Sequence, residues 1–444
     1  MPPHLHHGLL ARRLLVPGLL AGALLRLAVL PTPGTGDVTI WKVWSVAASQ
    51  DLTGVYGVGG SPTERRLLRW QNEEMTVDYP PAALEELAIV GRLYGTTHPG
   101  AEDSRQFNAA VKLPGLLAEV AIVGLILTWG RRRFGMDAAA WTALAWWLNP
   151  ALVIDGPLLG YLDALMAVPA VLALVCAVAG AAWLSGALLA LALLTKAQAI
   201  FTAPVILAAL VARRHDRPWR RALLGALGGA TTSVIVTAPY IARGAWPNVM
   251  QALGRLATHD SLSAYGANVW WIVTWVLRVF DVAGEWGWWR AITQDVRILA
   301  ISRAVALGVP NPRLVGMAIV GGLCAWGAWR AWRSSSTAHA AALAGWSAFA
   351  YALFAAQVHE NHLYLAVPFL VVAGGLDRRY RRLCWAVSMI LSLNLVLFYG
   401  FGRDWPDVVH RSWTVIDASV WLAFGSLAVF TWATRVMTRP EASG

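Results

Sequence analysis

The stretch LPGLLAEVAIVGLILTWGRRR, residues 113–133, joins an apolar run directly to three consecutive arginines. Its first 17 residues, 113–129, approach the roughly 20 residues that a helix needs to cross about 30 Å of hydrocarbon. Basic residues that follow an apolar span are typical of a cytoplasmic loop. The stretch therefore predicts a membrane-crossing helix together with its orientation.

Similar apolar runs recur along the 444-residue chain, which is 57% hydrophobic and 14% charged. A soluble domain cannot hide that much apolar surface in one core. The runs predict about twelve spans, at residues 9–30, 113–129, 138–154, 162–178, 183–194, 197–211, 223–241, 314–332, 340–356, 363–376, 383–401 and 413–432. We expect an all-α polytopic membrane protein that forms a single integral membrane domain over residues 1–444.

The net charge of +11 would indicate a nucleic-acid partner in a soluble protein, but here its distribution indicates topology. Eighteen of the 36 Lys and Arg residues fall on one predicted side of the membrane, with only four acidic residues beside them. This is the pattern of cytoplasmic loops. Both termini are therefore predicted to be cytoplasmic, and no nucleic-acid partner is expected.

Two long stretches, residues 32–111 and 242–312, fall on the outer side. The first holds ten of the 25 acidic residues, and apolar positions at helical spacing follow Pro80 and Pro81. This pattern predicts a helix along the membrane surface that begins at the prolines. The second stretch is dense in tryptophan interrupted by Arg and Glu, which is typical of segments at the lipid headgroups. Any chemistry is expected to face outward.

Asp37 follows the first predicted span in the sequence TPGTGD, where Gly34 and Gly36 allow the backbone to turn sharply. A carboxylate at that boundary can accept a proton from a hydroxyl nucleophile and act as a general base. It can equally serve as the N-cap of the helix that follows. Spacing alone leaves both interpretations open.

Further acidic residues lack an obvious structural role. Asp78 and Tyr79 precede a double proline that stiffens the turn. A turn held in this way can serve either substrate binding or packing. Asp155 and Asp163 bracket the interrupted segment GPLLGYL at the outer end of a span. Ionisable groups at that depth are functional candidates, although an ion pair with Lys196 is a structural alternative.

Two polar groups fall at other breaks between spans. Lys196 and Gln198 lie between short helices, where a lysine can meet a phosphate or extend to the interface. His359, Glu360 and His362 lie together in VHENH at the outer boundary, where packing does not explain them. The histidines are three residues apart without a third ligand, so no metal site is expected. The three cysteines likewise have no metal or disulfide spacing.

These elements occur in a fixed order: GD at 36–37, DYPP at 78–81, IDGPLLGYLDAL at 154–165, LLTKAQA at 193–199, ANVW at 267–270 and VHENHLYL at 358–365. In that order they resemble GT-C membrane glycosyltransferases over nearly the whole chain. The likeness is greatest to the dolichyl-phosphate-glucose glucosyltransferases of N-glycan precursor assembly. The resemblance implies a GT-C-like bundle of about 12 transmembrane helices with two long outer loops that carry amphipathic helices.

The resemblance further implies a transferase for a single hexose, glucose or mannose. The donor is a polyprenyl-phosphate-linked sugar, and the acceptor is a hydroxyl of a lipid-linked or cell-envelope glycan. Transfer inverts the anomeric carbon without a cofactor or metal, and Asp37 matches the base. The substrate-binding residues implied are Asp78, Tyr79, Asp155, Asp163, Lys196, Gln198, Arg255, Asn268, Trp270, His359, Glu360 and His362. Asn361 stands where the family has a lysine, so Lys196, Arg255 and His362 are candidates to meet the phosphate.

The Ala-, Arg- and Trp-rich composition indicates a bacterial protein of the inner or plasma membrane with its site facing the periplasm. Two other functions fit a polytopic chain. A transporter or lipid-linked sugar flippase would place ionisable residues near the midplane of discontinuous helices. A non-catalytic lipid-binding subunit would not need Asp37 or Glu360.

Overall fold

The computed structural model describes residues 3–57, 66–213, 215–256, 259–403, 411 and 414–439. Helices form nearly all of its regular structure, and the strands described, β1 (Leu68–Trp70) and β2 (Glu73–Met75), make one antiparallel hairpin. Among these described residues, five segments are long and apolar enough to cross a membrane: Arg105–Phe134, Pro218–Ala242, Pro312–Arg333, Arg378–Tyr399 and Ala418–Thr438. The prediction of an all-α chain with helices that can span a membrane is confirmed.

Three other predicted spans correspond to shorter apolar helices, namely Asp163–Ala179, Ala182–Thr195 and His362–Leu376. The predicted span 138–154 is instead broken at Leu148 and Asn149, between α6 (Met136–Trp147) and the segment Pro150–Leu159. The predicted span 197–211 is broken into a 3-10 helix, η4 (Ala197–Phe201), and α10 (Ala203–Leu210). The predicted span 413–432 corresponds to α20 (Ala418–Thr438), although residue 413 lies outside the described residues.

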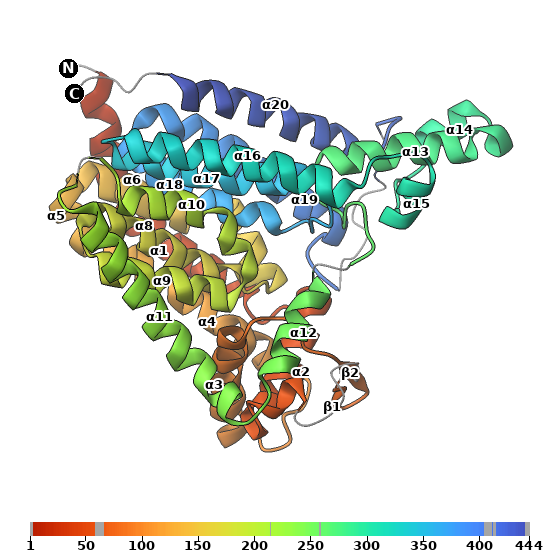
Figure 1. Cartoon of the computed structure of the whole chain (residues 1–444), viewed down its shortest axis with the longest axis horizontal. Helices are drawn as coiled ribbons and strands as arrows, with labels where there is room; N and C mark the ends of the chain where they lie inside the picture. The colour runs from red at the N-terminus through yellow and green to blue at the C-terminus, as the bar shows by residue number, and fades with distance from the viewer. Residues whose placement is uncertain are drawn as a thin grey trace. The chain divides into compact units, whose positions relative to one another are not determined.

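Residue contacts divide the chain into two compact units. Unit 1 comprises residues 1–200, 217–258 and 402–404, and unit 2 comprises residues 201–216, 259–401 and 405–444. In Figure 1 the red to yellow helices belong to unit 1, and the cyan and blue helices belong to unit 2.

A buried ion pair joins the first helix of unit 1, α1 (Pro3–Val29), to α4 (Arg105–Leu125). The Arg26 Nε of α1 lies 2.9 Å from Glu119 Oε2 of α4, and both side chains are buried. The Arg26 guanidinium also lies 4.0 Å from the ring centroid of Trp147, at the end of α6 (Met136–Trp147). An isolated charge buried among apolar helices is costly, so the ion pair accounts for the presence of these two charged residues inside apolar segments.

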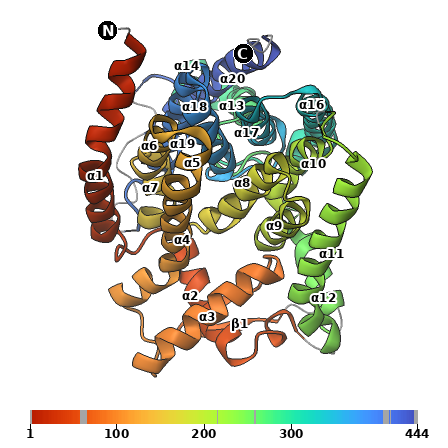
Figure 2. The ribbon, with the colours of Figure 1, turned by 90° about the vertical axis from the view of Figure 1, so that its left-hand side faces the viewer.

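Glycines allow close packing of α9 (Ala182–Thr195) on α11 (Pro218–Ala242), which run side by side in Figure 2. A Cβ added at Gly186 would lie 1.8 Å from the Gly225 carbonyl oxygen, and one added at Gly228 would lie 1.9 Å from the Trp183 oxygen. Small residues of this kind are how membrane helices bring their backbones into contact. On its other side α9 packs on α8 (Asp163–Ala179).

The remainder of unit 1 is a layer built around α2 (Gly36–Gln50) and α3 (Pro81–Thr97), with α12 (Trp246–Leu256) sharing the same apolar core. Figure 2 shows α3 crossing α2 in this layer. Pro80 is the N-cap of α3 and Pro81 its first residue, which confirms the helix start predicted from the sequence. Proline fits this position because the first amides of a helix have no partner within the helix.

Unit 2 is a helical bundle around α17 (Thr337–Phe354), of which 15 of 18 residues are buried. α16 (Pro312–Arg333), α18 (Ala366–Leu376) and α20 pack directly on α17, and α19 (Arg381–Tyr399) packs between α18 and α20 (Figure 1). The many alanines of α17 allow neighbours on several sides. The Trp-rich outer stretch forms α13 (Val269–Trp286), α14 (Trp288–Thr293) and α15 (Ile301–Ala306).

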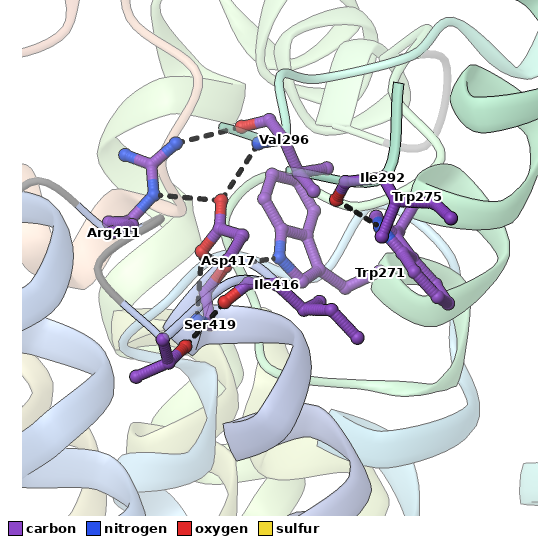
Figure 3. A network of polar contacts seen from close by, with 9 residues as sticks. Trp271, Trp275, Ile292, Val296, Arg411, Ile416, Asp417 and Ser419 are labelled. Atoms are coloured by element: carbon purple, nitrogen blue, oxygen red, sulfur yellow. Dashed lines mark hydrogen bonds and ion pairs between the residues drawn. The ribbon is translucent and has the colours of Figure 1, made fainter. Parts of the chain in front are cut away.

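A polar network ties α13 to the start of α20 (Figure 3). Asp417, the buried N-cap of α20, accepts hydrogen bonds from the amides of Ser419 at 2.9 Å and Val296 at 2.8 Å, and from Arg411 Nε at 3.2 Å. The Ser419 hydroxyl donates to Asp417 at 2.6 Å and accepts from the Trp271 indole at 2.7 Å. Asp417 and Ser419 thus join the start of α20 to Val296 and Trp271, which lie more than 100 residues earlier in the sequence.

Candidate active site

Asp37 lies in the first turn of α2 and is partly exposed. The N-cap is Thr35, whose Oγ1 accepts a hydrogen bond from the Asp37 amide at 3.3 Å. The N-cap of α2 is therefore Thr35, and the alternative that Asp37 is the N-cap is wrong. A negative charge in the first turn is favoured by the helix dipole. Of the two glycines expected to turn the chain, Gly34 has the left-handed φ of +69°.

Trp41 and Trp44 follow Asp37 at helical spacing and therefore lie on the same face of α2. That face meets Tyr79: the Tyr79 ring centroid lies 5.1 Å from the Trp41 centroid and 5.5 Å from the Trp44 centroid. Burial raises the pKa of the Tyr79 hydroxyl above its ordinary value; the Lys196 ammonium opposes this effect, and the carboxylates of Asp37 and Asp163 reinforce it. Three of the predicted residues, Lys196, Asp37 and Asp163, therefore lie within electrostatic range of a fourth, Tyr79.

The turn that carries Asp78 and Tyr79 is held through its main chain. The Tyr56 hydroxyl donates to the Tyr79 carbonyl at 2.7 Å, and Arg255 Nη2 donates to the Val77 carbonyl at 2.9 Å. Arg255, predicted to bind substrate, thus binds the turn itself. The Asp78 carboxylate lies within electrostatic range of both tyrosine hydroxyls.

Asp163 and Lys196 form a buried ion pair, with Lys196 Nζ 2.5 Å from Asp163 Oδ1 and side chains only 2% and 5% exposed. The ion pair considered as a structural alternative therefore exists. Lys196 Nζ also lies 5.7 Å from the Tyr79 ring centroid, and the Asp155 carboxylate lies within its electrostatic range. Lys196 is an extended residue between α9 and η4, and the partly buried Gln198 follows within η4.

The segment between Asp155 and Asp163 is bound to the start of α2. Asp155 is fully buried in a π-helix, η3 (Ile154–Leu159), which ends at Gly160 in a left-handed conformation. The Thr35 amide donates to the Leu159 carbonyl at 2.9 Å, and the Trp41 indole donates to the Gly160 carbonyl at 2.9 Å. Unit 1 thus brings together the predicted residues Asp37, Tyr79, Asp155, Asp163 and Lys196.

The predicted residues of the ANVW element belong to unit 2 and have structural partners there. Asn268 is the N-cap of α13: its Oδ1 accepts from the Trp271 amide at 2.9 Å, and its Nδ2 donates to the Ala355 carbonyl at 3.4 Å. The Trp270 indole donates to the Phe354 carbonyl at 2.7 Å. Both side chains fasten α13 to the end of α17.

The VHENH element packs on the same part of unit 2. His362 Nδ1 shares a hydrogen bond of 2.9 Å with the Tyr351 hydroxyl, and His359 Nδ1 lies 3.9 Å from the buried Glu360 Oε2. Beside them is a small pocket of about 280 Å³ lined by Gly266, Ala267, Phe349, Ala352, Leu353, Val358, His359, Glu360, Leu363, Ile390 and Asn394. The Asn394 amide donates to the Glu360 carbonyl at 3.1 Å.

Within the part of the chain that the structure describes, no group of three or more His, Cys, Asp or Glu side chains is arranged to hold a metal ion. No protein-family model and no curated protein matches the sequence. Any functional conclusion therefore rests on the residues and their contacts.

Three contributors to the unit 1 site were not expected from the sequence. Trp41 and Trp44 were detectable, because they lie four and seven residues after Asp37 in an amphipathic run. Lys112 carried only the weak signal of a single lysine at the edge of an apolar segment. Its contacts are with three main-chain oxygens, which the sequence does not distinguish, and with the Thr32 hydroxyl.

Proposed function

We propose that the protein is a membrane glycosyltransferase with a GT-C-like arrangement of about twelve crossings. It transfers one hexose, glucose or mannose, from a polyprenyl-phosphate donor to a hydroxyl of a lipid-linked or cell-envelope glycan. The site faces the periplasm of a bacterial membrane, with both termini in the cytoplasm. The observation that carries the proposal is the position of the Asp37 carboxylate, in the first turn of α2 beside Tyr79 and the Asp163–Lys196 pair.

In the proposed reaction the acceptor hydroxyl gives its proton to the Asp37 carboxylate while its oxygen attacks the anomeric carbon. The bond between that carbon and the phosphate oxygen breaks on the opposite face, so the configuration inverts. The polyprenyl phosphate leaves with the electron pair as an anion and needs no general acid. One base and nearby positive charge are sufficient for this chemistry.

The positive charge of unit 1 near Asp37 is already partly engaged. Lys196 is paired with Asp163, and Arg255 donates to the Val77 carbonyl. A phosphate would therefore share Lys196 with Asp163 or share Arg255 with the Val77 carbonyl. In the proposed enzyme these contacts replace those of the lysine that the family has at the position of Asn361.

A transporter or flippase for lipid-linked sugars is the second candidate, and one observation favours it. The buried Asp163–Lys196 pair lies where helices are interrupted, between the π-helix η3 and α8 on one side and between α9 and η4 on the other. Discontinuous helices with ionisable groups at their breaks are typical of transporter sites.

Sugar transfer from polyprenyl-phosphate glucose and mannose to an acceptor lipid extract tests the proposal, with purified protein in detergent. Asp37→Asn is expected to lower transfer at least about 100-fold, the contribution of a general base. Asp137→Asn is the matched control, because Asp137 is 53% exposed and pairs only with an exposed Arg12. Lipid binding without transfer by the wild type would favour the flippase, and full activity in Asp37→Asn would refute Asp37 as the base.

A further inference from the structure

Lys112 of α4 is a buried lysine whose ammonium contacts only neutral oxygens. Its side chain is 4% exposed, and Nζ shares its three protons among Thr32 O at 2.8 Å, Thr32 Oγ1 at 3.2 Å, Pro157 O at 3.2 Å and Leu158 O at 2.9 Å. Within the described ranges it makes no ion pair. Removing a charge from water is costly, and four oxygen dipoles compensate this cost only while their geometry holds.

The oxygens that Lys112 contacts belong to a longer series. The carbonyls of Pro157, Leu158, Leu159 and Gly160 are consecutive, and each accepts a hydrogen bond from Lys112, from the loop that leads into α2, or from α2 itself. The donors besides Lys112 are the Thr32 hydroxyl to Leu158 O at 3.1 Å, the Thr35 amide to Leu159 O at 2.9 Å and the Trp41 indole to Gly160 O at 2.9 Å. We call these four carbonyls and their donors the carbonyl clamp.

The clamp depends on a close approach of two backbones. Gly160 has a φ of +88°, and a Cβ there would lie 2.3 Å from Val38 Cγ2 and 3.0 Å from Lys112 Cε. Gly34 has a φ of +69°, and a Cβ there would lie 2.5 Å from the Leu159 oxygen. Only glycine fits both the backbone conformation and the space at these two positions.

We propose that Lys112 is a positioning residue that holds Asp37 in register with Asp155 and Asp163 by closing the carbonyl clamp. The inference rests on the proposed function only in taking Asp37 as the base. The clamp joins the Thr35 cap, two residues before Asp37, to the segment between the two other carboxylates. Packing alone does not require an ammonium, because an unbranched apolar side chain of equal length would fill the same space without desolvating a charge.

The test compares Lys112→Met, which keeps the length of the side chain, with Lys112→Gln, which keeps hydrogen-bond donors without the charge. Lys42→Met is the matched control: Lys42 is also a buried lysine of unit 1, but its partner at 2.5 Å is Asp103, outside the clamp. Steady-state transfer gives kcat and KM for each variant. Hydrogen exchange at the Thr35 amide reports on the clamp without using activity, because that amide donates to Leu159.

Lys112→Met is expected to lower kcat about 10- to 100-fold with KM nearly unchanged, since small misplacements of a catalytic group have effects of this size. Exchange of the Thr35 amide is expected to accelerate, with Lys112→Gln intermediate and Lys42→Met like the wild type. The inference would be overturned if Lys112→Met kept the kcat and the Thr35 exchange rate of the wild type. It would also be overturned if Lys42→Met lost as much kcat as Lys112→Met. If Lys112→Met does not fold, the kcat and the Thr35 exchange rate of Lys112→Gln test the inference in its place. If the wild type transfers no sugar, the proposed function fails, and the exchange rates alone decide the clamp.

Discussion

The Asp163–Lys196 pair allows a quantitative test of how dry the site is. Both side chains are at least 95% buried and their charged atoms are 2.5 Å apart. Removing one member of such a pair leaves an uncompensated buried charge and typically costs about 3–5 kcal/mol. We therefore expect Asp163→Asn and Lys196→Met each to reduce the free energy of unfolding by an amount in this range.

The two single variants are not expected to be equal. In Asp163→Asn, the ammonium of Lys196 keeps the Asp155 carboxylate within electrostatic range, which places the loss near about 3 kcal/mol. In Lys196→Met, two buried carboxylates lose their cation, which places the loss near about 5 kcal/mol. The double variant carries neither charge of the pair and loses mainly one hydrogen bond and a cation–π contact with Tyr79, together about 2 kcal/mol.

The assay is reversible unfolding of the protein in mixed micelles for the wild type, both single variants and the double variant. The sum of the single losses, about 8 kcal/mol, should exceed the double loss by about 6 kcal/mol. The same cycle on Arg12 and Asp137, whose side chains are 48% and 53% exposed, is the control and should give a coupling below about 1 kcal/mol. Additive single losses below about 1 kcal/mol at the buried pair would refute the argument that the site excludes water.

Two further variants test the same unit. Gly160→Ala places a Cβ 2.3 Å from Val38 Cγ2 at a positive φ, so we expect it to destabilise the protein by at least about 2 kcal/mol. The control Gly124→Ala, which has open space around the new Cβ, should change the stability by less than about 1 kcal/mol. Equal effects of the two substitutions would contradict the close approach of the backbones at Gly160. Burial and the neighbouring Glu85 raise the pKa of Glu86 to about 8, so the native state binds this proton more tightly than the unfolded chain. The resulting contribution to stability is present below about pH 4.5 and is lost as the pH rises through 8. Glu86→Gln should therefore raise the temperature at the midpoint of unfolding at pH 9, but not at pH 4, relative to the wild type. The same shift of this temperature at both pH values would argue against a buried Glu86 carboxyl.

The elements that the sequence predicted best are those marked by local chemistry. The double proline placed the start of α3, and the break between α9 and η4 fell at Lys196 as expected. The start of α4 was predicted at residue 113 but lies at Arg105. The helix begins there because the Ser104 hydroxyl accepts from the Phe107 amide at 3.1 Å, and a helix end set by a cap extends past the apolar run.

The candidate site was predictable as a set of residue types but not as a set of contacts. The pairing of Asp163 with Lys196 was one of two alternatives, because an isolated charge at a helix break indicates a partner without identifying it. The cap lies at Thr35, two residues before Asp37, and hydrophobic patterning does not fix a helix start to within two residues. Three of the four acceptors of Lys112 are backbone atoms that any sequence would supply, so only the three-dimensional arrangement distinguishes them.

The network around Asp417 has a consequence for the order of events during biosynthesis. The Val296 amide and the Trp271 indole find their partners, Asp417 and Ser419, more than 100 residues later in the chain. While the ribosome is still translating the intervening helices, α13 has been made but its polar anchor has not. The polar network shown in Figure 3 forms only when the start of α20 has emerged, so α20 completes the polar contacts of a segment synthesised long before it.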